Sequence, residues 1–184
     1  GIPDGDSSPH FQTPEEAPVG SFILHFSADD LDSGENGIIN CSTKTSGFQV
    51  QKIFAAEFKV VNTVLHDREK TDSKGLLITC VDFGSPPLAS DQYVIIDFTD
   101  VNDHAPEFQS KFVVGASIQS NTSGEYVATV HAVDPDLGDN GLFGYSIQPP
   151  LDSFFRIDML NGNISTAVDH IPDALQHYNL TILA

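Results

Sequence analysis

The sequence contains few positive charges, no tryptophan and no long apolar run. Eight Lys and Arg residues stand against 26 Asp and Glu residues among 184, which gives a formal net charge of -18. A chain this acidic repels nucleic acids and anionic membranes, so we expect neither as a partner. No run of about 18 apolar residues is present and no signal peptide opens the chain, so no segment is expected to span a membrane.

Patterns typical of enzymes are also missing. The seven histidines and two cysteines show no H-x-x-x-H or mixed Cys/His spacing, which argues against a zinc site. A cysteine nucleophile needs a nearby base and an electropositive setting, and nothing near either cysteine supplies them. We therefore predict that the chain is not an enzyme, has no catalytic residue and takes no small-molecule substrate.

One acidic segment is present twice. Residues 30–37 (DLDSGENG) return as residues 134–141 (DPDLGDNG), which indicates tandem copies of one domain. The repeated residues are carboxylates, carboxamides and turn-forming glycines, so an oxygen-rich site is repeated. Such a site suits a hard cation, and Ca²⁺ is the obvious candidate.

Short alternating apolar runs predict β-strands, and clusters of Gly, Pro, Asn and Asp separate them. The clearest runs are residues 22–26, 76–80, 93–98, 126–130 and 145–147. Residues 52–61 (KIFAAEFKVV) are ambiguous, and we predict one strand there. Many short strands with turn signals between them predict an all-β chain of two tandem β-sandwiches.

Glycosylation triplets indicate an extracellular location. About one would be expected by chance, whereas four are present, which favours secretion. Their asparagines are Asn40, Asn121, Asn163 and Asn179.

Five motifs in order resemble the extracellular cadherin repeat. They are residues 14–20 (PEEAPVG), 67–69 (DRE), 80–88 (CVDFGSPPL), 100–104 (DVNDH) and 134–136 (DPD). The resemblance covers nearly all of the chain and implies the cadherin fold: two Greek-key, immunoglobulin-like β-sandwiches joined by a calcium-binding linker. We expect one repeat over 1–104, with a stub of an earlier linker, and a C-terminally truncated repeat over 105–184. Because residues 8–11 (SPHF) match 105–108 (APEF), we also expect an earlier domain before residue 1.

The resemblance implies up to three Ca²⁺ ions at the joint between the repeats. The motifs place seven carboxylates around this joint, which would repel one another unless cations lay between them. Val101, His104 and Asn140 would contribute backbone carbonyls, and a third ion would also want an Asp beyond Ala184. The expected ligands are Glu15, Asp67, Glu69, Asp100, Val101, Asn102, Asp103, His104, Asp134, Asp136 and Asn140.

The two outer ends depart from the family pattern. A partial upstream site is expected, formed by Asp6, Asp30, Asp32, Asn36 and Asp82. At the downstream end Gln119 replaces an expected Glu, and 169–171 (DHI) replaces DRE. We expect that joint to bind fewer ions or none and to bend; the alternative is that the local alignment is in error and the site is acidic after all.

Several single features are interpreted through the same resemblance. The absence of Trp excludes the membrane-distal tip of a strand-swapping junctional cadherin, and the HAV triplet at 131–133 is interpreted as part of a core strand. In the family's sheet, a strand like the one that contains Cys41 lies opposite the strand that contains Cys80. Either a disulfide or two buried thiols would fit this arrangement. Arg68 is expected to be solvated or a structural partner, and Phe48, Phe154 and Phe155 to lie in the core.

The function that the resemblance implies is calcium-dependent cell–cell adhesion. The departures favour a long, non-classical cadherin, whose parent would be a single-pass, membrane-anchored ectodomain. The expected partner is another cadherin, bound homophilically or heterophilically. The alternative is a receptor or ligand ectodomain that binds a different cadherin in planar-polarity-type signalling.

Overall fold

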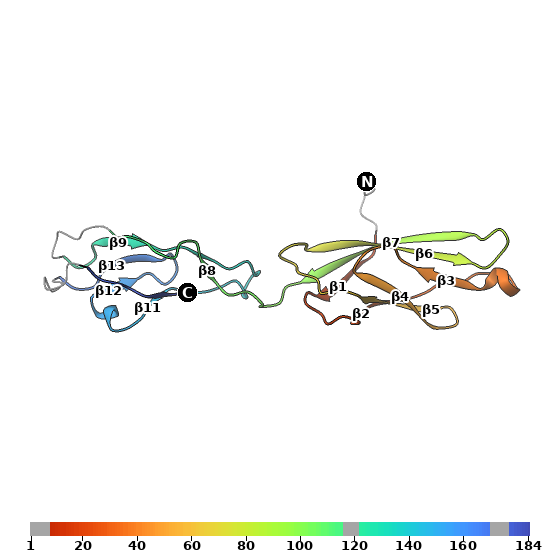
Figure 1. Cartoon of the computed structure of the whole chain (residues 1–184), viewed down its shortest axis with the longest axis horizontal. Helices are drawn as coiled ribbons and strands as arrows, with labels where there is room; N and C mark the ends of the chain where they lie inside the picture. The colour runs from red at the N-terminus through yellow and green to blue at the C-terminus, as the bar shows by residue number, and fades with distance from the viewer. Residues whose placement is uncertain (1–7, 116–121, 170–176) are drawn as a thin grey trace. The chain divides into compact units, whose positions relative to one another are not determined.

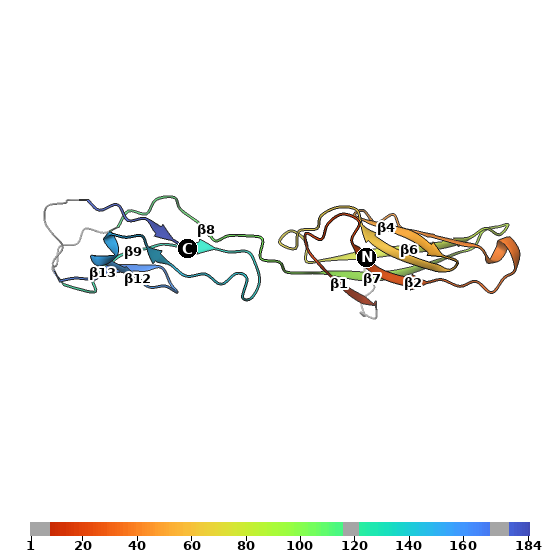
Figure 2. The ribbon, with the colours of Figure 1, turned by 90° about the horizontal axis from the view of Figure 1, so that it is seen from below.

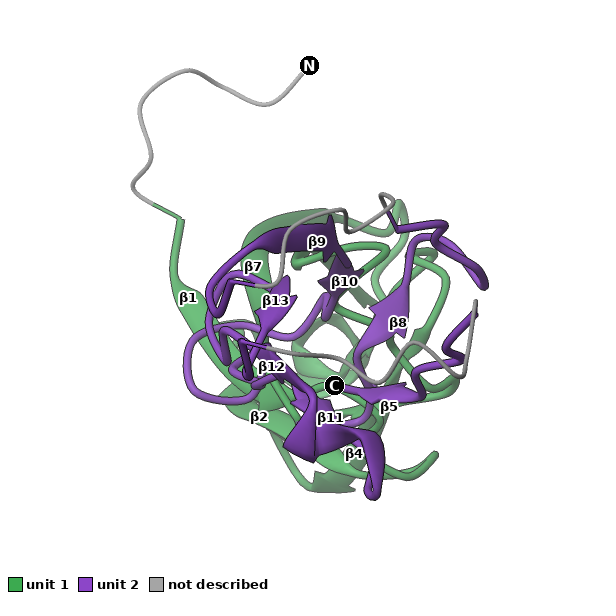
Figure 3. Cartoon of the chain, turned by 90° about the vertical axis from the view of Figure 1, so that its left-hand side faces the viewer, with its two compact units in different colours: residues 1–101 green, residues 102–184 purple. Residues whose placement is uncertain are grey.

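The computed structural model describes residues 8–115, 122–169 and 177–184. In these residues the secondary structure consists of β-strands and two short 3-10 helices, η1 (Gly34–Gly37) and η2 (Leu151–Ser153), with no α-helix. The all-β prediction is therefore confirmed. No helix in the described part of the chain is long and apolar enough to cross a membrane. The chain divides into two compact units, residues 1–101 and 102–184 (Figure 3).

Unit 1 is a sandwich of two sheets (Figure 1). One sheet has the order β1 (His10–Pro14), β7 (Ala89–Thr99), β6 (Ser73–Asp82) and β3 (Ile39–Ser42). The other has the order β2 (Phe22–Ser27), β5 (Glu57–Asn62) and β4 (Phe48–Phe54). β1 runs parallel to β7, and the other pairs are antiparallel. The chain changes sheet after β1, β2, β3 and β5, as in Greek-key sandwiches of the immunoglobulin type.

Alternation along the strands builds the core of unit 1. Val94, Ile96 and Phe98 of β7 are buried, whereas the residues between them are partly exposed, because successive side chains point to opposite faces of a sheet. In the facing sheet, Phe58 and Val60 of β5 are fully buried. Burial of such side chains contributes about 1.5–3 kcal/mol each, which makes this interior the main source of stability.

A disulfide links the inner strand β6 to β3, which lies at the edge of the same sheet. Cys41 and Cys80 are direct cross-strand partners with Cα atoms 4.0 Å apart, and they are bonded. Of the two states that the sequence left open, the structure therefore has the disulfide.

Unit 2 has shorter strands around its own core. Its sheets pair β10 with β8, β11 with β14, and β13 with both β12 and β9. The bounds are β8 (Glu107–Phe108), β9 (Tyr126–Thr129), β10 (Ala132–Val133), β11 (Ser146–Ile147), β12 (Phe155–Ile157), β13 (Asn163–Thr166) and β14 (Ile182–Leu183). Val127, Tyr145, Phe155 and Ile164 lie in the core, and Phe154 packs against it.

Two local predictions are wrong. Residues 52–61 are not one strand, because β4 ends at Phe54, the chain turns at Ala55 with φ 45°, and β5 begins at Glu57. The HAV triplet is not a core strand. His131 and Val133 are exposed, and only Ala132 is half-buried, because β10 lies at the margin of the unit and pairs only with the short β8 among the described strands.

Candidate metal centre

The two repeated acidic segments fold into the same turn. The N–H of Asp32 donates to Asp30 Oδ1 over 2.8 Å, and the N–H of Asp136 donates to Asp134 Oδ1 over 3.0 Å. A Cβ on the glycine that closes each copy would overlap the carbonyl oxygen of the second Asp. Glycine is therefore required at these positions to let the turn close around the carboxylates.

Among the described residues of unit 1, Glu15 is the most buried carboxylate. It follows β1 and is 1% exposed, and its Oε2 accepts the Arg68 N–H over 2.7 Å. Its Oε1 accepts the Val101 N–H over 2.9 Å. These bonds tie the loop at 67–69 and the end of β7 to one carboxylate, so three acidic motifs that are distant in sequence converge at one end of unit 1.

Asp67 and Glu69 complete a group with Glu15. Each of the three offers one carboxylate oxygen, and these oxygens lie within 4.8 Å of one another. Loss of hydration and the neighbouring Glu15 carboxylate raise the pKa of Glu69 above its ordinary value. Exposed Lys70 bonds Asp67 over 2.5 Å, and this contact raises the pKa of Lys70. The group is therefore electrostatically crowded and would be relieved by a cation.

Arg68 is the cation that lies among these carboxylates. Its side chain is 9% exposed, contacts Glu69, and lies 2.5 Å from Asp100 Oδ1 and 3.6 Å from Glu15 Oε1. Of the two roles expected for it, Arg68 has the structural one. The motifs named Arg68 only as a neighbour of two ligands, and its position between two acids in the DRE triplet was the available signal.

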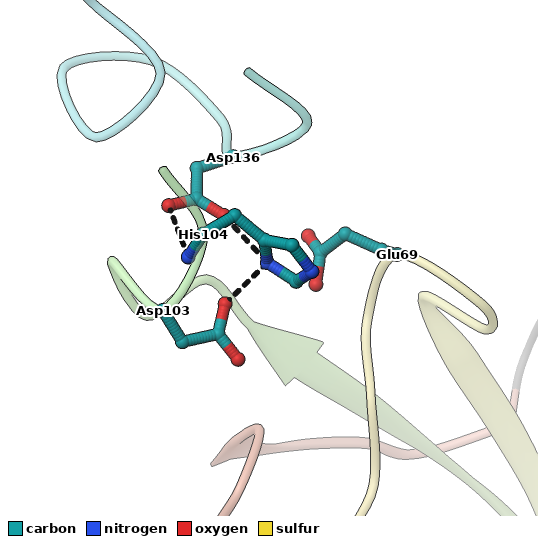
Figure 4. Close-up of side chains that lie close together, drawn as sticks. All are labelled: Glu69, Asp103, His104 and Asp136. Atoms are coloured by element: carbon teal, nitrogen blue, oxygen red, sulfur yellow. Dashed lines mark hydrogen bonds and ion pairs between the residues drawn. The ribbon is translucent and has the colours of Figure 1, made fainter. Parts of the chain in front are cut away.

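Unit 2 gathers Asp103, His104 and Asp136 (Figure 4). His104 Nδ1 lies 2.7 Å from Asp103 Oδ1 and 3.2 Å from Asp136 Oδ1, and the His104 N–H donates to Asp136 Oδ2 over 3.3 Å. The Asp136 side chain is fully buried, and its Oδ1 makes no hydrogen bond. The sequence assigned a role only to the backbone of His104, whereas the structure also brings its imidazole to the carboxylates.

The other expected ligands of the joint lie near these groups in the chain. Val101 and Asn102 are exposed and follow β7, and Asp134 holds the turn that presents Asp136. Asn140 closes the same segment, and its N–H donates to the Leu137 carbonyl.

Within the expected upstream group, Asp82 is the buried member. This carboxylate is 8% exposed, and its Oδ1 accepts the N–H groups of Gly84 and Leu88, both over 2.9 Å. Asn36 Oδ1 also lies beside Gly84, 3.2 Å from where a Cβ would be. Asp30 and Asp32 are exposed, and Asp6 lies outside the described residues.

The downstream group is only partly described. The Asp169 carboxylate accepts the Ser123 N–H over 2.9 Å, while Gln119 and Ile171 lie outside the described residues. Among the glycosylation candidates Asn40, Asn163 and Asn179 are exposed, and Asn121 lies outside the described residues.

The donor set in each unit fits Ca²⁺. Ca²⁺ takes six to eight oxygen ligands from carboxylates and carbonyls, which are the groups gathered here. The fully buried Asp136 oxygen that makes no hydrogen bond is a donor atom that a cation would satisfy. Carboxylate oxygens within 4.8 Å of one another in unit 1 are a second indication.

Comparisons with known proteins agree with the fold described above. A family model of the cadherin domain matches residues 115–184. Protocadherin gamma-B7 of Pan troglodytes is 32% identical over the whole chain, and Protocadherin Fat 4 of Homo sapiens is 34% identical over 90% of it. The chain belongs to the cadherin superfamily.

Solved cadherin structures share the fold. Domains 3–6 of Protocadherin Gamma B2 match with a TM-score of 0.78 and 34% identity over 85% of this chain and 40% of that one. Mouse Cadherin-23 EC22-24 matches with a TM-score of 0.83 and 28% identity, covering 95% of this chain and 56% of that one. This cadherin chain spans 21% of the length of Protocadherin gamma-B7 and 3% of that of Protocadherin Fat 4.

Proposed function

We propose that the chain is part of an extracellular cadherin ectodomain that acts in calcium-dependent cell–cell adhesion. We further propose that Ca²⁺ ions, up to three, bind around residues 100–104 and join the repeats on either side. The observation that carries the proposal is the gathering of carboxylates in each unit, with Glu15, Asp67 and Glu69 in unit 1 and Asp103 and Asp136 in unit 2.

Electrostatics supplies the mechanism. The chain carries a net charge of -18, and two of its acidic groups, Asp100 and Asp103, lie in the segment where the two repeats meet in sequence. Without ions this segment is a self-repelling linker. Ions that take ligands from both repeats oppose the repulsion, and because they bind only the ordered arrangement they stabilise it by mass action. Affinities of about 10⁻⁴–10⁻³ M suffice for extracellular calcium modules.

Adhesion through another cadherin is the partner hypothesis. The relatives are protocadherins, and one solved relative, Protocadherin gammaB7 EC3-6, is described as a cis-dimer, with a TM-score of 0.80 to this chain. Individually weak contacts of this kind gain strength from many copies on apposed cells. The parent protein is proposed to be anchored in the plasma membrane.

Bead aggregation tests the function. Beads coated with the chain should clump in 2 mM Ca²⁺, chosen as about the top of the range for extracellular modules, and disperse in EGTA. Clumping of beads that carry only this chain supports homophilic adhesion. Clumping only with beads that carry a second cadherin supports the receptor or ligand alternative. Aggregation that is equal in Ca²⁺ and EGTA contradicts the proposal.

A further inference from the structure

One of the glycosylation triplets, residues 40–42 (NCS), has a disulfide-bonded cysteine as its middle residue. All three residues lie in β3, where Cys41 is bonded to Cys80 of β6. Asn40 and Ser42 are exposed, whereas Cys41 between them is 5% exposed and belongs to the core, because alternate side chains of a strand point to opposite faces. The disulfide therefore holds the centre of the segment that would accept a sugar.

The triplet lies in an edge strand. In the described part of the chain, β3 pairs within its sheet only with β6, which in turn pairs with β7 (Figures 1 and 2). A strand with a single neighbour can open locally at a lower cost than global unfolding, and such opening would expose the triplet. Here Cys41 and Cys80 are direct partners in the register and are bonded, so the disulfide prevents the middle of β3 from leaving β6.

N-glycosylation requires the triplet as a free segment. The side-chain nitrogen of Asn40 attacks C1 of an oligosaccharide that is carried on a lipid diphosphate. The new N–C bond forms as the C–O bond to the diphosphate breaks, the diphosphate leaves with the electron pair, and a base of the transferase takes one amide proton. An amide nitrogen is a weak nucleophile, so the transferase has to surround the triplet to activate it. It cannot surround a triplet that is paired with β6 and bonded to it through the middle residue.

The order of synthesis gives the transferase a limited time. Cys80 follows Cys41 by 39 residues, which at a synthesis rate of about 5–20 residues per second takes about 2–8 s. During this interval the triplet has no disulfide partner. Formation of a disulfide takes seconds or longer after that. Addition of the sugar and closure of the disulfide therefore compete on similar timescales, and we expect about half of the chains to be modified at Asn40.

We propose that Asn40 is a conditional N-glycosylation site whose occupancy is set by competition with formation of the Cys41–Cys80 disulfide. The sugar is added before the disulfide closes, and closure excludes later addition. The chain is then made in two forms, one with a sugar beside Val81 and Ala89 on the outer face of the sheet and one with this face bare. The inference rests on the proposed extracellular location, because the secretory route supplies both the transferase and oxidising conditions.

The triplet at 163–165 (NIS) is an internal reference. It has the same first and third residues as the triplet at 40–42, its asparagine is exposed, and it contains no cysteine. Occupancy at Asn163 therefore reports how well the chain is delivered to the transferase, without a disulfide in the triplet itself.

Mass spectrometry of the chain made in the secretory route of cultured animal cells tests the proposal. Digestion with a peptide N-glycosidase in heavy-oxygen water marks each asparagine that carried a sugar. Secreted and intracellular chains are pooled, so that the result does not depend on whether a variant folds. Cys80→Ser leaves the acceptor triplet unchanged and removes the disulfide partner. It should raise occupancy at Asn40 about twofold and leave Asn163 unchanged, because competition at the first site is lost.

A short exposure of the cells to dithiothreitol separates the disulfide from other effects of the substitution. It should raise occupancy at Asn40 in the unaltered chain, and it should have no further effect in Cys80→Ser, which has no Cys41–Cys80 bond to delay. Occupancy at Asn163 should stay the same in all four samples.

The inference is overturned if occupancy at Asn40 is equal in Cys80→Ser and in the unaltered chain while Asn163 is modified. Equal low values would mean that a cysteine in the middle position weakens the acceptor by itself, and equal high values that the disulfide closes too late to compete. A parallel rise at Asn163 would also overturn it, since slower folding would then be the cause. Absence of sugar at every asparagine would contradict the proposed extracellular location and this inference with it.

Discussion

The Arg68 side chain places a positive charge among carboxylates that are expected to bind Ca²⁺. Its guanidinium contacts Glu69 and Asp100 and approaches Glu15, and only 9% of the side chain is exposed. A guanidinium can satisfy several carboxylates at once because it presents five donors. We interpret Arg68 as the internal counter-charge that keeps unit 1 folded when calcium is scarce.

Replacing Arg68 should make the stability of unit 1 more dependent on calcium. Arg68→Met keeps much of the side-chain length and removes the charge, which leaves buried carboxylates uncompensated. We expect the free energy of unfolding in EGTA to fall by about 3 kcal/mol. In saturating Ca²⁺ the loss should be smaller, because bound ions replace the missing charge.

Urea unfolding in the two buffers measures the difference. Arg156→Met is the matched control, since Arg156 is exposed on β12 and bonds Ser165. An equal loss for Arg68→Met in EGTA and in Ca²⁺ would contradict this role for Arg68.

The Asp158 carboxylate should make the stability of unit 2 depend on pH. Its Oδ1 accepts the N–H groups of Leu160 over 2.9 Å and Asn161 over 3.2 Å, and these bonds hold its pKa below the ordinary 3.8. A lowered folded-state pKa means that the contribution to stability is complete at neutral pH and is lost as the pH falls through that pKa. Asp158→Asn should therefore lower the melting temperature at pH 7.

The difference between Asp158→Asn and the unchanged chain should shrink as the pH is lowered toward 3, which differential scanning calorimetry can follow. Asp152→Asn, at an exposed position of the same unit, serves as the control. A gap in melting temperature that stays constant over this range would show that the charge on Asp158 is not the cause.

The sequence motifs predicted some residues of the candidate site and missed others. The resemblance to the cadherin motifs named Glu15, Asp67 and Glu69 together, and the structure brings these three to one place. The environment of Arg68 and the imidazole contacts of His104 did not follow, because they depend on how loops from different motifs pack. A motif names the ligand atoms and leaves the neighbouring side chains undetermined.

Among the strands, β3 and β6 carry the covalent link of the fold. The Cys41–Cys80 disulfide closes a sequence separation of 39 residues, for which the loop-entropy relation gives a stabilisation of about 4 kcal/mol. The double variant Cys41→Ala/Cys80→Ala should lose about that much stability in urea unfolding. Adding dithiothreitol should destabilise the unchanged chain and leave the double variant unaffected. A double variant as stable as the unchanged chain would contradict this contribution.

Strand boundaries show why part of the fold could not be predicted. Alternation located β2, β6 and β7 because apolar side chains such as Leu24, Ile78 and Val94 face the core. The β4–β5 hairpin was missed because its turn uses Ala55 at φ 45° instead of a glycine or asparagine.

At the scale of the whole molecule, the repeat offset predicted two copies of one domain, and the chain has two compact units. The chain carries a net charge of -18, and both units present acidic groups that a divalent cation would neutralise. Asp103→Ala removes one carboxylate from the proposed centre and should lower Ca²⁺ affinity about tenfold, as one fewer charged ligand weakens an oxygen site.

Calorimetric titration of the chain with Ca²⁺, paired with X-ray scattering in Ca²⁺ and in EGTA, tests the central claim most directly. The account predicts saturable binding in the range of about 10⁻⁴–10⁻³ M. It also predicts a scattering profile that broadens in EGTA as the linker is released. Absence of any binding heat, together with identical scattering profiles in the two buffers, would contradict the account.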